Sequence, residues 1–443
     1  MTLPEGYGRI ELGDGFVVRN TYTYGSLRVF DVRSGSVVER SVDPAAGVSD
    51  LDPETGQLAY SVLGGDIRIR ELGKPVSGPA PVSTQVTPVV ETDATPVAWR
   101  GQWWLSKPIA GWTLALRHTA TGRVVATRTG GPTDAPFTAD WNGRTASGGL
   151  LPNGAYTWTL TAQPVAGQGS ALTLSGTSRL VGGTAVRRDH AGGGSLPDGN
   201  GDLLVRTTSG SLDFWHGTGT GRVSGKTAGA GWGTSVNTAV PFGDVNGDNC
   251  NDVMLRMSSG ELRTYKPGCG KPLTPAVAYT KAGSGFGGMN LMTSPGDLTG
   301  DGRADLVARN GDSLYLYAGK AGGTLASGVR FGSGWSPFTH IAGAGDLDGD
   351  RIGDLVARKS DGSLYRYSGA GGGRLKAGVK IKSGWGASYT TVVGVGDLDS
   401  DAKRDLVVRD RAGLLFRISG DGNGSFGTAV QIGSGWGSFK GLF

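Results

Sequence analysis

One short acidic loop recurs four times in the second half of the chain, at intervals of about 50 residues. Asp stands at the first, fifth and ninth positions of every copy, and the third position always carries an oxygen-bearing side chain. The four copies, called loops 1 to 4 below, are residues 244–252, 297–305, 346–354 and 397–405. A motif repeated at this period predicts a repeat fold, because each unit must stack on its neighbours to bury a core.

The oxygen atoms in these loops predict a hard divalent cation, and calcium is the obvious candidate. Ca²⁺ takes about six to eight oxygen ligands in a flexible shell. Two carboxylates about 4 Å apart repel by roughly 4 kcal/mol at an effective dielectric constant of about 20, and a turn alone does not need so many Asp residues. We expect about four calcium sites with a structural role, because no open coordination position beside a catalytic base is visible.

The expected ligands occupy the same five positions in every loop. Positions 1, 3, 5 and 9 supply side-chain oxygens, and position 7 supplies only a backbone carbonyl, which leaves its side chain free to vary. The four sets are Asp244, Asn246, Asp248, Cys250 and Asp252; Asp297, Thr299, Asp301, Arg303 and Asp305; Asp346, Asp348, Asp350, Ile352 and Asp354; and Asp397, Asp399, Asp401, Lys403 and Asp405.

Two departures from the pattern matter. Asn246 and Thr299 at position 3 remove one charge from loops 1 and 2, which predicts weaker binding there. Only loop 2 has Gly at position 6, and the residues that replace it in the other loops, Asn249, Arg351 and Ala402, put a tight turn at that position in doubt.

Short strands and turns dominate the rest of each repeat. The chain has 81 Gly residues without a collagen-type period, and no stretch has the pattern of a long amphipathic helix, so we expect an all-β protein. One repeat holds four strand-like segments in about 50 residues, the size of a propeller blade. The aromatic residues Trp232, Phe286, Trp335, Trp385 and Trp436 keep step with the repeat.

Five such units predict a five-bladed β-propeller over residues 184–443. The first unit is degenerate, because only residues 198–202 remain of its acidic loop after a glycine insertion. Residues 439–443 stand where a sixth unit would begin, so this segment is expected to complete the first blade and close the ring, although residues 184–187 compete for that place. The alternative is a seven-bladed ring that recruits the N-terminal strands, with the preceding unit as an insertion.

The first 183 residues divide into two further parts. Residues 1–90 comprise period-two strand pairs, up to about residue 75, and the start of a Pro-rich extended linker at residues 75–96. The strand pairs look like one or two propeller blades, as if the chain began within a domain. Residues 91–183 contain short alternating strands with Asn-Gly and Pro-Asn-Gly turns, which predict a β-sandwich.

Two family resemblances follow from these motifs. The acidic loops, with Phe242-Gly or Pro295-Gly before the first Asp of loops 1 and 2, resemble the FG-GAP (VCBS-like) repeats of integrin-type propellers on secreted bacterial proteins. The Gly-Ser-Gly-Trp phrase that ends several repeats is more weakly similar to five-bladed tachylectin-type lectins. Residues 141–143 and 152–156 resemble the immunoglobulin-like domain of flagellar-hook-capping proteins, which implies a spacer or interaction module.

Charge and cysteine content bear on location and partners. The net charge is +5, but the basic residues are scattered, so we expect no nucleic-acid partner. No apolar segment is long enough to span a membrane. Cys250 and Cys269 are close in sequence within one repeat, which favours a disulfide in an oxidising compartment over two free thiols. We therefore expect an extracellular, secreted protein, although no signal peptide is visible in this chain.

The functional expectation is a secreted, calcium-stabilised recognition or adhesion module, lectin-like and without catalytic activity, that binds a glycan or protein surface. The alternative is an accessory or targeting part of a larger secreted enzyme or toxin complex. An enzyme acting from the centre of the ring ranks last, because no acid–base pair recurs and the four histidines lack ligand spacing. Trp335 and Trp385 are candidate sugar-stacking residues, but packing between blades is the favoured role for them.

Overall fold

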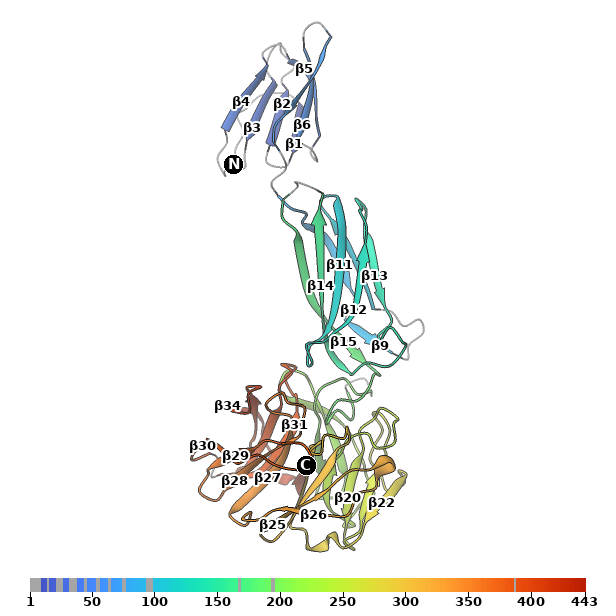
Figure 1. Ribbon diagram of the computed structural model, residues 1–443, viewed down its shortest axis with the longest axis vertical. Helices are drawn as coiled ribbons and strands as arrows, with labels where there is room; N and C mark the ends of the chain where they lie inside the picture. The colour runs from blue at the N-terminus through green and yellow to red at the C-terminus, as the bar shows by residue number, and fades with distance from the viewer. Residues whose placement is uncertain are drawn as a thin grey trace.

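The regular secondary structure of the chain is almost entirely β-strand, as predicted. The computed structural model describes residues 9–13, 16–20, 27–31, 38–43, 46–52, 56–62, 65–73, 77–92, 99–165, 169–192, 196–385 and 388–443. Figure 1 shows three bodies that follow one another along the longest axis: the N-terminal strands, a β-sandwich and a propeller. No helix among these residues is long and apolar enough to cross a membrane.

The N-terminal body contains two small antiparallel sheets that share one core. The first sheet has the order β1-β2-β3-β4 and the second β5-β6-β7, and Phe16, Val29 and Leu58 are buried between them. The strands are β1 (Arg9–Gly13), β2 (Phe16–Asn20), β3 (Leu27–Asp31), β4 (Val38–Asp43), β5 (Ala46–Asp52), β6 (Gln57–Val62) and β7 (Ile67–Glu71). These strands form sheets of their own and do not join the C-terminal ring, so the seven-bladed alternative is wrong.

The middle body is a two-layer sandwich with sheet orders β13-β10-β8 and β12-β11-β14-β15-β9. Alternation in β10 places Trp99, Trp103 and Leu105 in the core, as period two requires. The strands are β8 (Pro81–Val86), β9 (Val89–Glu91), β10 (Trp99–Leu105), β11 (Ile109–His118), β12 (Val124–Gly130), β13 (Phe137–Trp141), β14 (Gly154–Pro164) and β15 (Leu172–Val181).

The predicted linker at residues 75–96 needs correction. Its described part supplies β8 and β9, each of which is the edge strand of one sandwich sheet. The sandwich therefore begins well before residue 91. The prolines of this segment favoured a linker, but edge strands tolerate proline whereas central strands do not.

The C-terminal body is a ring of five four-stranded sheets, each formed by consecutive strands except the first. The blades are β16 (Leu203–Arg206), β17 (Leu212–Gly217) and β18 (Val223–Thr227) with β35 (Gly441–Leu442); β19 (Val236–Pro241), β20 (Val253–Met257), β21 (Leu262–Tyr265) and β22 (Tyr279–Gly283); β23 (Leu291–Gly296), β24 (Asp305–Asn310), β25 (Ser313–Tyr317) and β26 (Val329–Gly332); β27 (Phe338–Gly345), β28 (Asp354–Lys359), β29 (Leu364–Tyr367) and β30 (Val379–Lys382); and β31 (Tyr389–Gly396), β32 (Asp405–Asp410), β33 (Leu415–Gly420) and β34 (Phe426–Gly433). Three short 3₁₀ turns complete the body: η1 (Phe286–Gly288), η2 (Ala321–Gly323) and η3 (Trp436–Ser438).

The C-terminal strand closes the ring. In β35, Leu442 pairs with Val205 and Gly441 with Arg206, so the end of the chain supplies the innermost strand of the first blade. The prediction for residues 439–443 is confirmed. The competing segment at residues 184–187 forms no strand of this blade.

Five separate hydrophobic clusters join each blade to the next, including the fifth to the first. Each cluster contains one of the periodic aromatic residues Trp232, Phe286, Trp335, Trp385 and Trp436. Trp335 and Trp385 are only 6% and 9% exposed, so they offer no free ring face to a sugar. The ligand-binding role considered for these two residues is therefore replaced by the packing role.

Candidate metal centres

Each acidic loop connects the innermost strand of a blade to the second strand. Position 9 lies where the second strand begins, and the carboxylates of Asp252, Asp305, Asp354 and Asp405 are fully buried. Asp354 accepts hydrogen bonds from the backbone N–H groups of Leu347 and Gly369, both at 2.8 Å. Asp305 and Asp405 receive equivalent bonds in their own blades. Position 9 thus ties the loop to two strands of its blade.

Positions 1 and 5 fold the loop on itself. The position 1 carboxylate accepts backbone N–H groups from later in the loop, as Asp346 does from Gly349 at 2.7 Å and from Arg351 at 2.8 Å. The position 5 carboxylate accepts the N–H of position 7 at 2.9 Å in all four loops, where the donors are Cys250, Arg303, Ile352 and Lys403.

The turn at position 6 forms in every loop, although only loop 2 has Gly there. The backbone φ is +66° at Asn249, +85° at Gly302, and +70° at both Arg351 and Ala402. The doubt raised by the missing glycines is therefore removed. A left-handed conformation at Arg or Ala costs roughly 1–2 kcal/mol, so the loop's other interactions must offset this strain.

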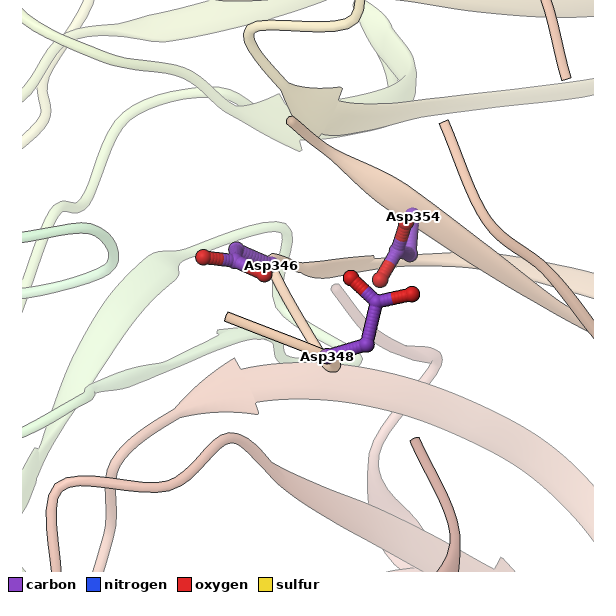
Figure 2. Close-up of side chains that lie close together, drawn as sticks. All are labelled: Asp346, Asp348 and Asp354. Carbon is purple, nitrogen blue, oxygen red and sulfur yellow. The ribbon is translucent and has the colours of Figure 1, made fainter. Parts of the chain in front are cut away.

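Loop 3 brings three carboxylates together. Oxygen atoms of Asp346, Asp348 and Asp354 lie within 4.8 Å of one another, and Figure 2 shows the side chains of Asp348 and Asp354 pointing toward each other. Asp348 accepts a bond from Ser368 Oγ through Oδ2, while its Oδ1 is buried without a hydrogen-bond partner. A buried, unpartnered carboxylate oxygen beside two further carboxylates suits a calcium ion, because hard cations prefer such oxygens. Asp350 instead pairs with Lys376 at 2.9 Å.

Loop 4 gathers Asp397, Asp399 and Asp405 in the same way, but a cation of the protein already reaches them. The Arg417 guanidinium donates to Asp399 and lies 3.7 Å from Asp405. Arg366, at the equivalent place in the preceding blade, instead donates to the carbonyl of Asn423 at 2.7 Å. Because the guanidinium competes with a metal, loop 3 is the better candidate of the two.

Loops 1 and 2 use position 3 differently. Asn246 donates to Asp248 at 2.9 Å, and Thr299 donates to Asp297 at 3.2 Å. These bonds occupy oxygens that a metal would need, and weaker calcium binding in loops 1 and 2 stays a prediction.

The degenerate first unit contains an acidic residue that the sequence pattern missed. Asp189 accepts the backbone N–H groups of Asp198 and Gly199 at 2.9 and 2.8 Å, as position 1 does in other loops. Asp202 occupies position 9 and accepts the N–H of Gly217 at 2.9 Å. The glycine-rich insertion between Asp189 and Asp198 hid this equivalence, since spacing was the only available signal.

Burial raises the pKa of the position 9 carboxyls, to about 6 for Asp354 and to about 7 for Asp252 and Asp405. Neighbouring loop carboxylates add to this shift. A group whose folded-state pKa is raised contributes stability below its unfolded pKa, near 4, and that contribution is lost as pH rises through the folded value. The metal-free loops therefore destabilise the fold at neutral pH.

This electrostatic cost predicts a pH-dependent difference between wild type and Asp354→Asn, both freed of calcium. The unfolding free energy of wild type, minus that of the variant, should fall between pH 4 and pH 7. Only wild type has a carboxyl at position 354, and this carboxyl ionises at a lower pH in the unfolded chain than in the folded one. Urea unfolding at several pH values measures this difference. If this difference in unfolding free energy grew with pH instead, the protein would already stabilise the charged Asp354 carboxylate without a metal.

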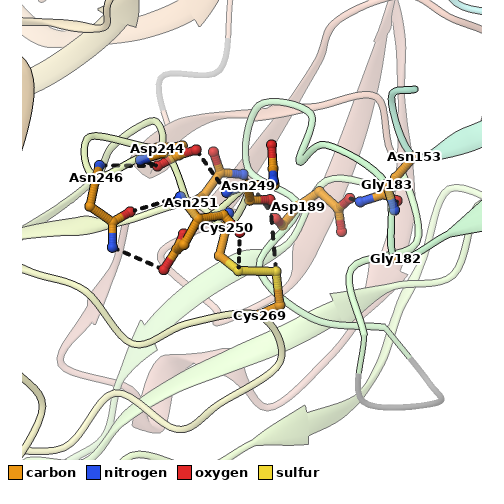
Figure 3. The surroundings of a disulfide bond; sticks show 12 residues. Asn153, Gly182, Gly183, Asp189, Asp244, Asn246, Asn249, Cys250, Asn251 and Cys269 are labelled. Atoms are coloured by element: carbon orange, nitrogen blue, oxygen red, sulfur yellow. Dashed lines mark hydrogen bonds between the residues drawn. A yellow bond between two sulfur atoms is a disulfide. The ribbon is translucent and has the colours of Figure 1, made fainter. Parts of the chain in front are cut away.

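The predicted disulfide is present and links loop 1 to the segment after β21. Cys250, at position 7, bonds to Cys269 with a sequence separation of 19 residues (Figure 3). The adjacent Asn251 Nδ2 donates to the carbonyls of Val186 at 2.6 Å and Asp189 at 2.8 Å. The bridge therefore stabilises a loop that holds the connection between sandwich and propeller.

Replacing both cysteines with serine should lower the unfolding free energy by about 3 kcal/mol, since a closed loop of this length removes that much unfolded-state entropy. Urea unfolding of Cys250→Ser/Cys269→Ser, compared with wild type under oxidising and reducing conditions, measures the effect. Reduction should destabilise wild type to the level of the double variant and leave the variant unchanged. An unchanged wild type after complete reduction would contradict the expectation.

Loops 3 and 4 face the sandwich across a cleft of about 770 Å³. The sandwich side contributes His118 and Arg123, and the propeller side contributes Asp346 together with several basic residues. The basic residues on the propeller side are Arg351, Lys403 and Arg404. Among the described residues, the side chains of Arg123, Arg351 and Arg404 form no ion pair. The cleft thus combines a candidate metal loop with basic side chains that form no direct ion pair.

Comparison with known proteins supports the repeat assignment. The chain contains an FG-GAP-like repeat at residues 297–357, a range that spans loops 2 and 3. No curated protein matches the sequence.

Similarity to solved structures is distant. A protein from Bacteroides fragilis described as a candidate 6-phosphogluconolactonase has 11% identity and a TM-score of 0.30, with 73% of this chain and 96% of that chain covered. A functionally unknown protein from Desulfotomaculum acetoxidans has 8% identity and a TM-score of 0.28, with coverage of 97% and 98%. Hsv2 from Kluyveromyces lactis has 9% identity and a TM-score of 0.16, with coverage of 70% and 93%. Scores this low carry no argument about function.

Proposed function

We propose that this protein is a secreted, calcium-stabilised recognition module that binds a glycan or protein surface and catalyses no reaction. The observation that carries the proposal is the position of loop 3, where Asp346 lines the cleft and lies close to Asp348 and Asp354. Calcium at this loop would both hold the cleft wall in place and add to its positive potential. The cleft then favours ligands with acidic groups.

The other parts of the chain support the same role. The disulfide agrees with an oxidising, extracellular compartment. The immunoglobulin-like sandwich, similar in its turn motifs to hook-capping proteins, acts as a spacer that presents the propeller. Contacts such as the ion pair between Arg179 of β15 and Asp198 of the first propeller unit, at 3.1 Å, hold the two bodies together.

An array of neutral and acidic glycans, probed with the purified protein in calcium and in EGTA, tests this proposal. The experiment is run at a temperature where circular dichroism shows the calcium-free protein to be folded. Acidic glycans should bind in calcium, and Arg351→Glu should weaken that binding, whereas Arg330→Glu on the outer strand β26 should not. If binding to acidic glycans is the same in calcium and in EGTA, and the same for wild type and Arg351→Glu, the proposal is contradicted.

A second function, an accessory or targeting part of a larger secreted assembly, is favoured by the N-terminal sheets. Strand β7 exposes Ile67 and Ile69 by 75% and 67%, and β1 exposes Leu12 by 71%. Apolar side chains gathered on edge strands are typical of surfaces that another protein covers. Purification of the native protein from culture medium by size exclusion distinguishes the two functions, because only the accessory role requires a stable complex.

A further inference from the structure

The axis of the propeller contains a cavity of about 250 Å³ that lies apart from the acidic loops. Its walls come from the innermost strands β19, β23, β27 and β31 and from the end of the chain, while Arg187 and Arg188 come from the segment that enters the propeller from the sandwich. The cavity thus has a wall contributed by every blade, and two basic residues that belong to none of the strands.

The two arginines form the floor of the cavity at the end nearest the acidic loops. Gly345 and Gly396 are the last residues of β27 and β31. A Cβ added to Gly345 would lie 3.2 Å from Arg187 Cδ, and one added to Gly396 would lie 2.9 Å from the Arg187 carbonyl oxygen. The entering segment therefore packs closely against both strand ends.

The opposite end of the cavity is open to solvent. Asn290, Thr339 and Thr390 line it and are exposed, and they stand at the start of, or just before, the innermost strands. The five residues of extended strand from Thr339 to Gly343 span roughly 13 Å. The channel is therefore a blind pocket with a polar mouth and a cationic floor.

The positive charge of the floor is only partly compensated. Arg187 donates through Nη2 to the carbonyls of Ser294 at 2.5 Å and Gly343 at 3.2 Å, and Arg188 donates through Nη2 to an oxygen of the terminal carboxylate of Phe443. Both Nε atoms are buried without a hydrogen-bond partner. Burial lowers the pKa of Arg187 to about 9 and of Arg188 to about 10, with Arg188 adding to the shift of Arg187, so both stay charged at neutral pH.

Among the described residues, no Asp or Glu side chain is free to pair with these guanidinium groups. Asp202 is the acid that acts on Arg188, but its Oδ2 already accepts the N–H groups of His190 and Ala191, both at 2.8 Å, and its Oδ1 accepts the N–H of Gly217. Arg404, whose Cδ would lie 3.7 Å from a Cβ on Gly345, adds further positive charge beside Arg187. Buried charge without a partner is costly, and a bound anion would relieve the cost.

We propose that the axial cavity is a binding site for a small anion bearing a carboxylate or phosphate group, held at the floor by the unpartnered Nε–H groups of Arg187 and Arg188. The ligand enters through the mouth formed by Asn290, Thr339 and Thr390, on the face opposite the acidic loops. The volume excludes a polymer and admits a compact metabolite or the acidic end group of a longer chain. This site is independent of calcium and of the proposed recognition role.

Isothermal titration calorimetry with inorganic phosphate and, separately, with succinate tests the proposal at low ionic strength. Asn290→Asp places a negative charge at the mouth, about 13 Å from the floor, and should weaken binding severalfold, since Arg309 Nε, 3.2 Å from the side-chain oxygen, offsets part of the charge. Gln431→Glu makes the same amide-to-carboxylate change on the exposed outer strand β34 and should leave binding unchanged. Arg188→Gln should abolish it.

The two titrants distinguish a phosphate ligand from a carboxylate ligand, and saturable binding of either supports the site. If Arg188→Gln does not fold, the comparison of Asn290→Asp with Gln431→Glu still decides. The proposal is overturned if neither anion binds wild type, or if binding is the same in wild type and Asn290→Asp.

Discussion

Removal of calcium with EGTA at neutral pH is expected to lower the Tm of the propeller by at least about 10 °C. A ligand at 100 times its Kd stabilises the folded state by about 2.7 kcal/mol per site, and two occupied sites would contribute about 5 kcal/mol. For a domain of this size, each kcal/mol corresponds to roughly 2–4 °C. Without the ion, loops 3 and 4 each retain three carboxylates within 4.8 Å of one another, and their mutual repulsion opposes folding.

Variants of loop 3 separate metal binding from a general effect of charge. Asp348→Asn should remove most of the calcium-dependent shift of loop 3, because Asp348 supplies the buried oxygen that has no other partner. Asp361→Asn is the matched control, since Asp361 lies in the turn after β28 and, among the described residues, forms a hydrogen bond with Ser363 alone. Differential scanning calorimetry in calcium and in EGTA gives both shifts, and equal shifts for the two variants would contradict the metal assignment.

Deletion of residues 439–443 is expected to destabilise the propeller most strongly among changes away from the loops. Leu442 is 5% exposed in the cluster that joins the fifth blade to the first. Its segment also donates backbone hydrogen bonds from Lys440 to Arg206 at 2.9 Å and from Phe443 to Leu204 at 2.8 Å. Deletion removes all of these and leaves β16 as an open sheet edge.

The point variant Leu442→Ala tests closure without changing chain length, and should lower the unfolding free energy by about 2–5 kcal/mol. Val430→Ala on the outer strand β34 is the control, because Val430 is 50% exposed. Urea unfolding measures both variants, and size exclusion should show association of the truncated chain through its open edge. A truncated chain that stays monomeric and as stable as wild type would show that β35 does not close the ring.

The regular features of this fold could be predicted because they repeat. Loops spaced about 50 residues apart fix the blade size, and the surplus segment after the last repeat identifies the closing strand. The periodic Trp and Phe residues predicted the clusters between blades for the same reason. Each of these features recurs along the chain, so it can be recognised by aligning the repeats with one another.

Features that depend on a single side chain could not be predicted. Arg366 and Arg417 stand at equivalent positions of neighbouring blades, yet only Arg417 turns into the acidic cluster. The floor of the axial cavity depends on Arg187 and Arg188, which belong to no repeat. Asp189 was hidden by the insertion that follows it. In each case the outcome depends on a three-dimensional contact that leaves no mark in spacing or composition.

Calorimetric titration of calcium into the metal-free protein tests the central claim most directly. The account predicts saturable binding to at least one site, which is lost in Asp348→Asn, retained in Asp361→Asn, and accompanied by proton release below pH 7 as the raised pKa of Asp354 requires. Absence of saturable binding in wild type, or equal binding in wild type and Asp348→Asn, would contradict it.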